Sequence, residues 1–319
     1  MGSSTLSSIP LIDLSKSMVP GTEAWRRTCE KMREAGERLG CFMVAGYDMP
    51  AGLVEDAFGA ARQLFDLPTE TKRRNTSHKP YCGYEGRTEV IPLFESLGIE
   101  DVDQPEAALR FTNLMWPEGN QSFCKVINRF GQELLTLGNL IQRMILESYG
   151  LEALVRSHID ESHCIMRLMN YEAAAADGSN SSPAVGLCNH TDKNWLTVLC
   201  QQGVEGLQVE SKQRGDWAHV PFIPSTFVVI IGDSLMAWSN GRLHSPTHRV
   251  MVFDKERFSI GLFSTPKDGA IIKVPEQLVD DGHALLFNPF NFSDFLYYFS
   301  TTGVKLSESA IHVFAGSHD

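Results

Sequence analysis

The sequence predicts a mainly β fold with flanking helices, whose core is a double-stranded β-helix (a jelly roll of cupin type). From Cys164 onward, short apolar segments alternate at a period of two and follow one another closely, which is typical of a double-sheet jelly roll. Before Cys164, apolar residues recur every three or four positions, which is typical of helices that cover a sheet.

The N-terminal elements follow from caps and breakers. Thr22 can cap a helix, because its hydroxyl can accept a hydrogen bond from a free N–H of the first turn. Residues 73–117 show no clear period, so they are expected to be loop-rich, with short elements, and to lie near the mouth of a site. The other expected elements are a helix over 23–39, a strand over 41–44, and a helix over 50–65 that begins with Pro50.

The longest expected helix runs from Asn120 to Gly150, and its apolar stripe should brace the sheet. A surface loop is expected over 173–182, because it ends in Asp, Gly, Ser and Asn residues. The predicted strands of the jelly roll cover residues 164–172, 184–190, 194–200, 207–210, 217–220, 227–231, 248–253 and 257–263.

Two regions are expected within one compact unit. Residues 1–117 form a helical and strand region, and residues 118–319 form the jelly-roll domain with its bracing helix. The aromatic segment 290–299 is expected to be helical, and two interpretations stay open for it. It is either plain core or a segment that closes over the site.

Composition excludes several classes of partner. The formal net charge of −11 disfavours nucleic acid, because phosphate backbones are bound by clustered Lys and Arg. No apolar stretch approaches the roughly 18 residues of a membrane span, and no signal-peptide pattern is visible, so no membrane partner is expected. Seven scattered cysteines without C-x-x-C spacing indicate reduced thiols and a cytoplasmic location. The oligomeric state is not indicated.

An H-x-D pair carries the strongest chemical signal. His190 and Asp192 lie two residues apart, so their side chains share one face of a strand. His248 from a neighbouring strand would add a third ligand. Two histidines and one carboxylate form the facial triad that holds Fe(II) with open positions on the opposite side. His244 competes for the distal position, but Pro246 interrupts the strand between the two histidines.

A second pair, His158 and Asp160, has the same spacing, and His219 lies downstream of it. Context separates the two sets, because Arg257 and Ser259 follow the first set on an apolar alternating run. They share a strand face, where a guanidinium can hold a carboxylate in two hydrogen bonds and the hydroxyl can add a third. We therefore expect iron and a carboxylic-acid cosubstrate at the first set, and an ordinary surface turn at the second.

These motifs resemble a known family. Residues 186–199, which contain His-Thr-Asp, and residues 240–250 resemble the iron-ligand segments of plant 2-oxoglutarate/Fe(II)-dependent dioxygenases, and Arg257-Phe-Ser259 matches their R-x-S. Residues 94–99, 111–117 and 190–194 are most similar to the AOP-type branch.

The resemblance implies an enzyme that uses Fe(II), 2-oxoglutarate and O2, with ascorbate supporting activity. Met169 stands where many relatives carry asparagine, a departure close to the metal. The implied ligands are His190, Asp192 and His248 for Fe(II), and Arg257, Ser259 and Tyr171 for the carboxylate of 2-oxoglutarate.

The implied reaction oxidises, by default hydroxylates, a small organic or specialised plant metabolite or hormone, and releases succinate and CO2. Two alternatives stay open: a metal-binding cupin-type protein or isomerase that does not use 2-oxoglutarate, and a non-catalytic binding module. Large apolar rings suit a small-molecule pocket, although each could equally be core. The candidate walls are Phe263, Phe94, Trp195 and Phe290.

Overall fold

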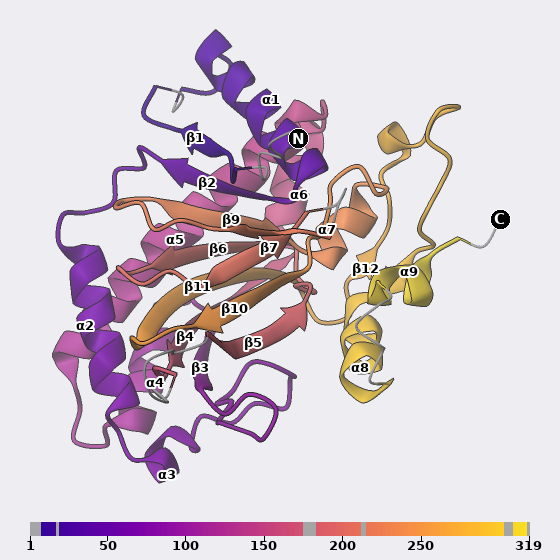
Figure 1. Ribbon diagram of the computed structural model, residues 1–319. Coiled ribbons are helices and arrows are strands. Elements are labelled where there is room, and N and C mark those ends of the chain that lie inside the picture. Colours follow the sequence, from indigo (N-terminus) through magenta and orange to yellow (C-terminus); the bar gives the residue numbers. More distant parts are fainter. Residues whose placement is uncertain (1–7, 17–18, 175–182, 212–214, 303–308, 318–319) are drawn as a thin grey trace, which may run out of the picture.

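Two stacked sheets with helices on one side make up the computed structural model, which describes residues 8–16, 19–174, 183–211, 215–302 and 309–317 (Figure 1). The larger sheet has seven strands, in the order β1 (Leu11–Asp13), β2 (Cys41–Ala45), β9 (Phe227–Ile231), β6 (Leu196–Gln201), β11 (Arg257–Pro266), β4 (Ser162–Tyr171) and β3 (Phe94–Glu100). The smaller has four, in the order β5 (Ala184–His190), β10 (His248–Val252), β7 (Leu207–Glu210) and β8 (Trp217–His219). A separate pair joins β12 (Ile271–Ile272) and β13 (Phe290–Asn291).

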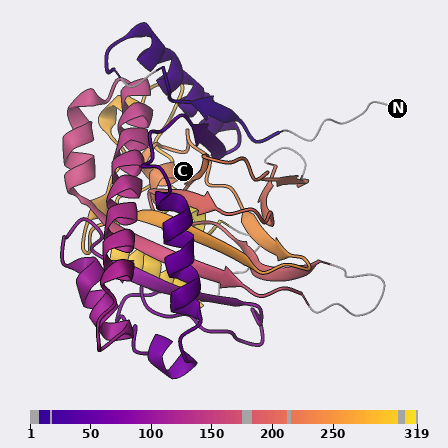
Figure 2. The same cartoon turned by 90° about the vertical axis from the view of Figure 1, so that its left-hand side faces the viewer.

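Helices α1 (Glu23–Arg38), α2 (Leu53–Phe65) and α5 (Gln121–Ser148) form a layer on the outer face of the larger sheet (Figure 2). Within the described residues, no helix is both long and apolar enough to cross a membrane. The remaining helices are α3 (Thr69–Lys72), α4 (Ala107–Met115), α6 (Val155–Asp160), α7 (Asp233–Trp238), α8 (Phe292–Thr302) and α9 (Ala310–Ala315), with 3-10 turns at Glu152–Leu154 and Glu276–Leu278.

Helices α1 and α5 begin directly after their capping residues, Thr22 and Asn120, close to where the sequence predicts. The Thr22 hydroxyl accepts from the Trp25 backbone N–H at 3.2 Å. The Asn120 side chain accepts from the Phe123 N–H at 3.0 Å. Each bond satisfies one of the amides that a helix start leaves without an intrahelical partner. By contrast, α2 begins at Leu53 and not at Pro50, because Gly52 takes a left-handed φ of 76° just before it.

Strand parity divides the core into two layers. On β4, Met166 and Leu168 belong to the apolar cluster between the larger sheet and the helices. Met169 and Tyr171 belong to the cluster between the two sheets. Successive residues of a strand point to opposite faces, so one face of each central strand serves packing against helices and the other faces the interior of the β-helix. The residues expected to carry chemistry lie on the interior face.

The segment 73–117 is loop-rich with short elements, as expected, but the sequence did not locate the two elements it contains, β3 and α4. Strand β3 is almost entirely buried although it contains polar residues. Its Glu95 pairs with buried Lys72 at 2.8 Å, and its Ser96 accepts from Arg167. Polar side chains that find partners inside the protein erase the alternation by which a strand is recognised in sequence.

Strands from both expected regions share one sheet. β1, β2 and β3 come from residues 1–117, and β4, β6, β9 and β11 come from the jelly-roll region. We infer that the two regions fold as one unit, because the larger sheet needs both for its strand order. Of the loop expected over 173–182, residues 175–182 lie outside the described residues.

His158 is buried, so the expected surface turn at the second H-x-D pair is wrong. It lies on α6 with 6% of its surface exposed, and its Nε2 lies 3.1 Å from Gln142 Oε1. Its ring centroid is 4.7 Å from that of Trp195. Burial lowers the pKa of His158 to about 4, so the imidazole is neutral in the folded protein at pH 7. Asp160 is instead exposed and pairs with Arg156.

We expect His158→Gln to reduce the acid sensitivity of folding. In the wild type, the unfolded chain binds a proton at His158 below its ordinary pKa of about 6.5, whereas the folded chain does so only below about 4. The free energy of unfolding therefore falls by about 2 kcal/mol from this group between pH 7 and pH 5. Urea unfolding of the metal-free protein at both pH values measures the difference. The matched control is His219→Gln, at an exposed position of β8, and an equal pH dependence in all three proteins would contradict the prediction.

Candidate metal and cosubstrate site

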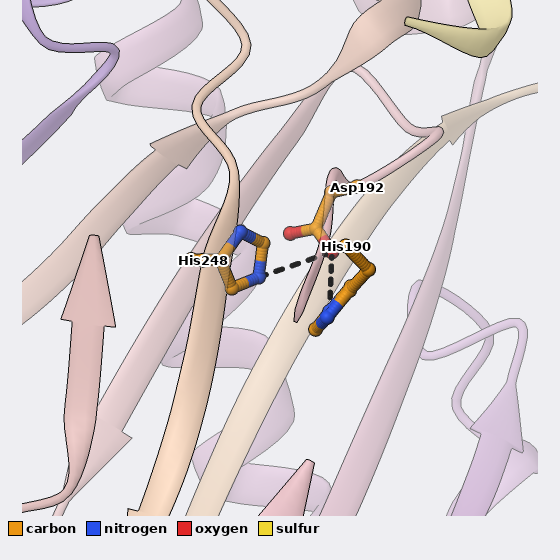
Figure 3. Close-up of side chains that lie close together, drawn as sticks. All are labelled: His190, Asp192 and His248. Carbon is orange, nitrogen blue, oxygen red and sulfur yellow. Dashed lines mark ion pairs between the residues drawn. The ribbon is translucent and has the colours of Figure 1, made fainter. Parts of the chain in front are cut away.

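The antiparallel register of β10 on β5 places His248 directly opposite His190. Asp192 follows β5 and turns back toward both rings (Figure 3). Its Oδ1 lies 3.8 Å from His190 Nε2 and 3.7 Å from His248 Nε2. One ligand atom from each of the three residues lies within 4.8 Å of the others, a spacing that could hold a metal ion.

The two rings present their Nε2 atoms to the same point for a chemical reason. His190 Nδ1 lies 2.8 Å from the Cys188 carbonyl, and His248 Nδ1 lies 3.2 Å from the Pro246 carbonyl. A carbonyl only accepts, so each Nδ1 carries the proton and each Nε2 keeps a free lone pair. Burial, reinforced by His248, lowers the pKa of His190 to about 4. Its imidazole is therefore neutral at pH 7, the form that binds a metal, and the group fits Fe(II).

Asp192 is held by a network that the sequence did not indicate. The Thr197 hydroxyl donates to Asp192 Oδ2 at 2.5 Å, and Asn194 Nδ2 donates to Thr197 Oγ1 at 2.9 Å. One carboxylate oxygen is thus engaged, and Oδ1 faces the histidines. The available signal was a hydroxyl inside an apolar strand, since a buried hydroxyl needs a partner.

The competing residues lie elsewhere in the described part of the chain. His158 and Asp160 are on α6, and His219 is on β8 beside Gln208. His244 precedes β10, where its backbone N–H donates to Gly36, and it is not part of the group that could hold a metal.

Arg257 is a buried cation with no carboxylate partner among the described residues. Only 1% of its surface is exposed. Its Nη2 donates to Gln201 Oε1 at 2.9 Å, and its Nη1 donates to Ser259 Oγ at 3.3 Å. Its Nε has no hydrogen-bond partner among the described residues. Burial lowers its pKa, because an uncompensated charge is costly in the interior. A carboxylate from a cosubstrate would supply the missing partner. Gln201 was not predicted, although it pairs with Ser259 across β6 and β11.

Tyr171 pairs with Arg257 across β4 and β11, and the guanidinium lies 4.9 Å from the centroid of its ring. Burial raises the pKa of Tyr171, so its hydroxyl remains a donor. That hydroxyl lies 3.9 Å from the Met169 sulfur, a weak acceptor. Met169 therefore occupies the space beside the tyrosine hydroxyl.

A cavity of about 1000 Å3 opens beside the His-Asp-His group, and His190, Asp192, Phe94 and Phe263 are among its lining residues. Trp195 and Phe290, the other two expected walls, do not line it. Both lie in the apolar core, where Phe290 contacts the ring of Phe295. Ring size and sequence position alone do not separate a wall from the core, because either environment accepts an aromatic side chain.

Helix α8, in the aromatic C-terminal segment, contributes both to the core and to the wall of the cavity. Its Phe295 is fully buried in the core, whereas Leu296 and Phe299 line the cavity. Lys193 Nζ lies 4.2 Å from the centroid of the Phe299 ring, a cation–π contact. This contact ties the helix to the His190–Asp192 turn.

The comparisons with known proteins agree with this geometry. Residues 162–266 match the model of the 2OG-Fe(II) oxygenase superfamily, and residues 9–117 match the model described as non-haem dioxygenase in morphine synthesis, N-terminal. The chain is 40% identical over 312 residues to an Arabidopsis thaliana protein described as probable 2-oxoglutarate-dependent dioxygenase AOP1, covering 96% of this chain and 95% of that protein. The chain belongs to the 2-oxoglutarate- and Fe(II)-dependent dioxygenases.

Solved dioxygenase structures share the fold. A rice dioxygenase for auxin oxidation superposes with a TM-score of 0.83 at 32% identity, covering 97% of this chain and all of that one (100%). JOX2 in complex with 2OG, Fe and JA gives 0.77 at 26% identity, covering 93% and 86%. The predicted jelly-roll fold, family, Fe(II) and 2-oxoglutarate are thereby confirmed, and the alternatives of an isomerase or a non-catalytic module are set aside.

We expect Thr197→Val to weaken Fe(II) binding by about ten- to a hundredfold, since outer-shell partners of metal ligands have effects of that size. Valine keeps the shape of threonine but removes the hydroxyl that holds Asp192 Oδ2. Anaerobic competition with a chelator measures the dissociation constant. Thr136→Val, at an exposed position of α5, is the control, and equal constants for both variants would contradict the role of Thr197.

Proposed function

We propose that this dioxygenase hydroxylates a small organic molecule, a specialised plant metabolite or a hormone, in the cavity beside the His-Asp-His group. The observation that carries this proposal is the joint lining: His190 and Asp192 border the same space as Phe94 and Phe263. When bound, Fe(II) supplies the oxidation by O2 with 2-oxoglutarate as cosubstrate, and succinate and CO2 are released. The protein residues bind, orient and exclude water.

The roles of the residues follow from their charge and hydrogen bonds. His190, Asp192 and His248 would hold Fe(II), which is supported by the two free Nε2 lone pairs facing one carboxylate oxygen. Arg257 would hold the distal carboxylate of 2-oxoglutarate together with Ser259, supported by the absence of an acidic partner in the described chain. Tyr171 would donate a further hydrogen bond from its neutral hydroxyl, which stays protonated because burial raises its pKa.

The cavity walls would select the substrate. Phe94 packs on Tyr171, with ring centroids 5.1 Å apart, so it links the substrate space to the cosubstrate end. The structures similar to this chain include one described as a dioxygenase for auxin oxidation and one described as a complex with JA. Auxin and JA are both small molecules. All seven cysteines are free, which supports a reducing compartment, and we propose the cytoplasm.

The cosubstrate assignment is tested by Arg257→Lys. Lysine keeps the charge but loses the two-pronged geometry, so the KM for 2-oxoglutarate should rise about ten- to a hundredfold. Succinate release at varied 2-oxoglutarate is the measurement. Arg156→Lys, whose side chain is 88% exposed on α6, controls for the substitution itself. An unchanged KM in Arg257→Lys would remove Arg257 from the cosubstrate site.

The substrate wall is tested by Phe263→Ala. A loosely held substrate spends less time with its C–H bond in place, so consumption of 2-oxoglutarate should continue while product falls. The ratio of succinate to product should therefore rise above that of the wild type, together with the substrate KM. The matched control is Phe253→Ala, because Phe253 is an exposed ring directly after β10 and does not line the cavity. The same ratio in both variants would show that Phe263 serves packing alone.

A further inference from the structure

Arg167 is a buried cation that lines the cavity and that neither the iron nor the 2-oxoglutarate site uses. Only 6% of its surface is exposed. The residues in register beside it are both glycines, Gly98 on β3 and Gly261 on β11, so no neighbouring side chain in that row covers it. It stands four positions before Tyr171 on the same face of β4, about 13 Å along the strand. Arg167 is thus separate from the cosubstrate end.

The guanidinium of Arg167 is only partly satisfied. Nη2 donates to Glu85 Oε2 at 3.1 Å and also to the Ser96 hydroxyl. Nη1 is buried and has no partner within the described residues. A buried N–H without an acceptor is costly, so the position calls for an acceptor that the described residues do not provide.

A buried nitrogen without a partner distinguishes Arg167 from Lys79 and Lys193, two other cations of the cavity wall. Lys79 pairs with Asp268 at 2.8 Å and Lys193 with Asp233 at 2.8 Å, and neither nitrogen is left without a partner. The side chain of Glu85 is 33% exposed, whereas that of Arg167 is 8% exposed. Water therefore screens the carboxylate more than the guanidinium, and the interior side of the pair stays positive.

We propose that the substrate is an acid with an apolar body, and that Nη1 of Arg167 binds its carboxylate. Charged acceptors give arginine its strongest hydrogen bonds, which favours a carboxylate over a neutral oxygen. The apolar body would lie against Phe94, Phe263 and Ile165, which line the same cavity. This inference rests on the proposed function of the cavity, and it adds the chemical class of the substrate.

The test is a binding experiment on the anaerobic protein loaded with Fe(II) and 2-oxoglutarate. Calorimetric titration with indole-3-acetic, jasmonic, cinnamic and octanoic acids is compared with titration of the primary amide of each. An amide has nearly the shape of the acid but no charge. At least one acid should bind about ten- to a hundredfold more tightly than its amide.

Substitutions at Arg167 and at Glu85 should change this preference in opposite directions. Arg167→Gln should remove it, and Arg167→Lys should retain part of it. Glu85→Gln removes the competing acid, so it should strengthen binding of the acid and widen its advantage over the amide. A purely structural Arg167 predicts no gain from Glu85→Gln. The double variant Arg167→Gln/Glu85→Gln keeps the charges balanced and serves if the single variant does not fold.

Three results would overturn the proposal: equal binding of acids and amides by the wild type, no binding of any acid in the panel, or an undiminished preference in Arg167→Gln and the double variant. Titration of the same proteins, loaded with Fe(II) alone, with 2-oxoglutarate separates this failure from failure of the proposed function. Tight 2-oxoglutarate binding together with any of the three results contradicts only the acidic substrate. A wild type that does not bind 2-oxoglutarate contradicts the proposed function itself.

Discussion

The pairing of β10 with β5 is the constraint on which the site depends. It sets His248 opposite His190, and a slip by one residue would turn the distal imidazole to the other face of the sheet. The carbonyls of Cys188 and Pro246 then fix which nitrogen of each ring faces inward. Both strands of this pair lie in the smaller sheet, so their register is supported by the apolar layer that packs the smaller sheet against the larger.

The side chains of Arg257, Arg167 and Lys193 are largely buried, and their partners compensate their positive charges to different degrees. Arg257 has only neutral partners, Arg167 has the partly exposed Glu85, and Lys193 has the fully buried Asp233. A buried cation is stable only with partners, so this order describes where further negative charge is tolerated. The most buried and least compensated of the three is Arg257, beside Tyr171.

Much of the architecture could be predicted from sequence, because caps and periodicity act locally. Thr22 and Asn120 begin their helices as expected, and several strands, such as Phe227–Ile231, match to the residue. Several of the failures share one physical cause, which is a polar residue whose partner is distant in sequence. Glu95 breaks the apolar pattern of β3, yet it is buried because it pairs with Lys72. His158 is buried although it is polar, because its Nε2 has Gln142 Oε1 as a partner. The Gln201 amide was missed for the same reason, because it accepts from Arg257, 56 residues further along the chain.

The cavity wall is built both from strands and from segments outside the sheets. Phe94 and Phe263 lie on strands, but much of the remaining wall comes from residues 78–85 and from α8, which lie outside the two sheets that set the triad. Segments of this kind tolerate sequence change better than paired strands. Natural selection can therefore alter substrate choice through these segments while the β5–β10 pair stays intact. One scaffold can in this way give rise to enzymes for unlike molecules without passing through variants that fail to fold.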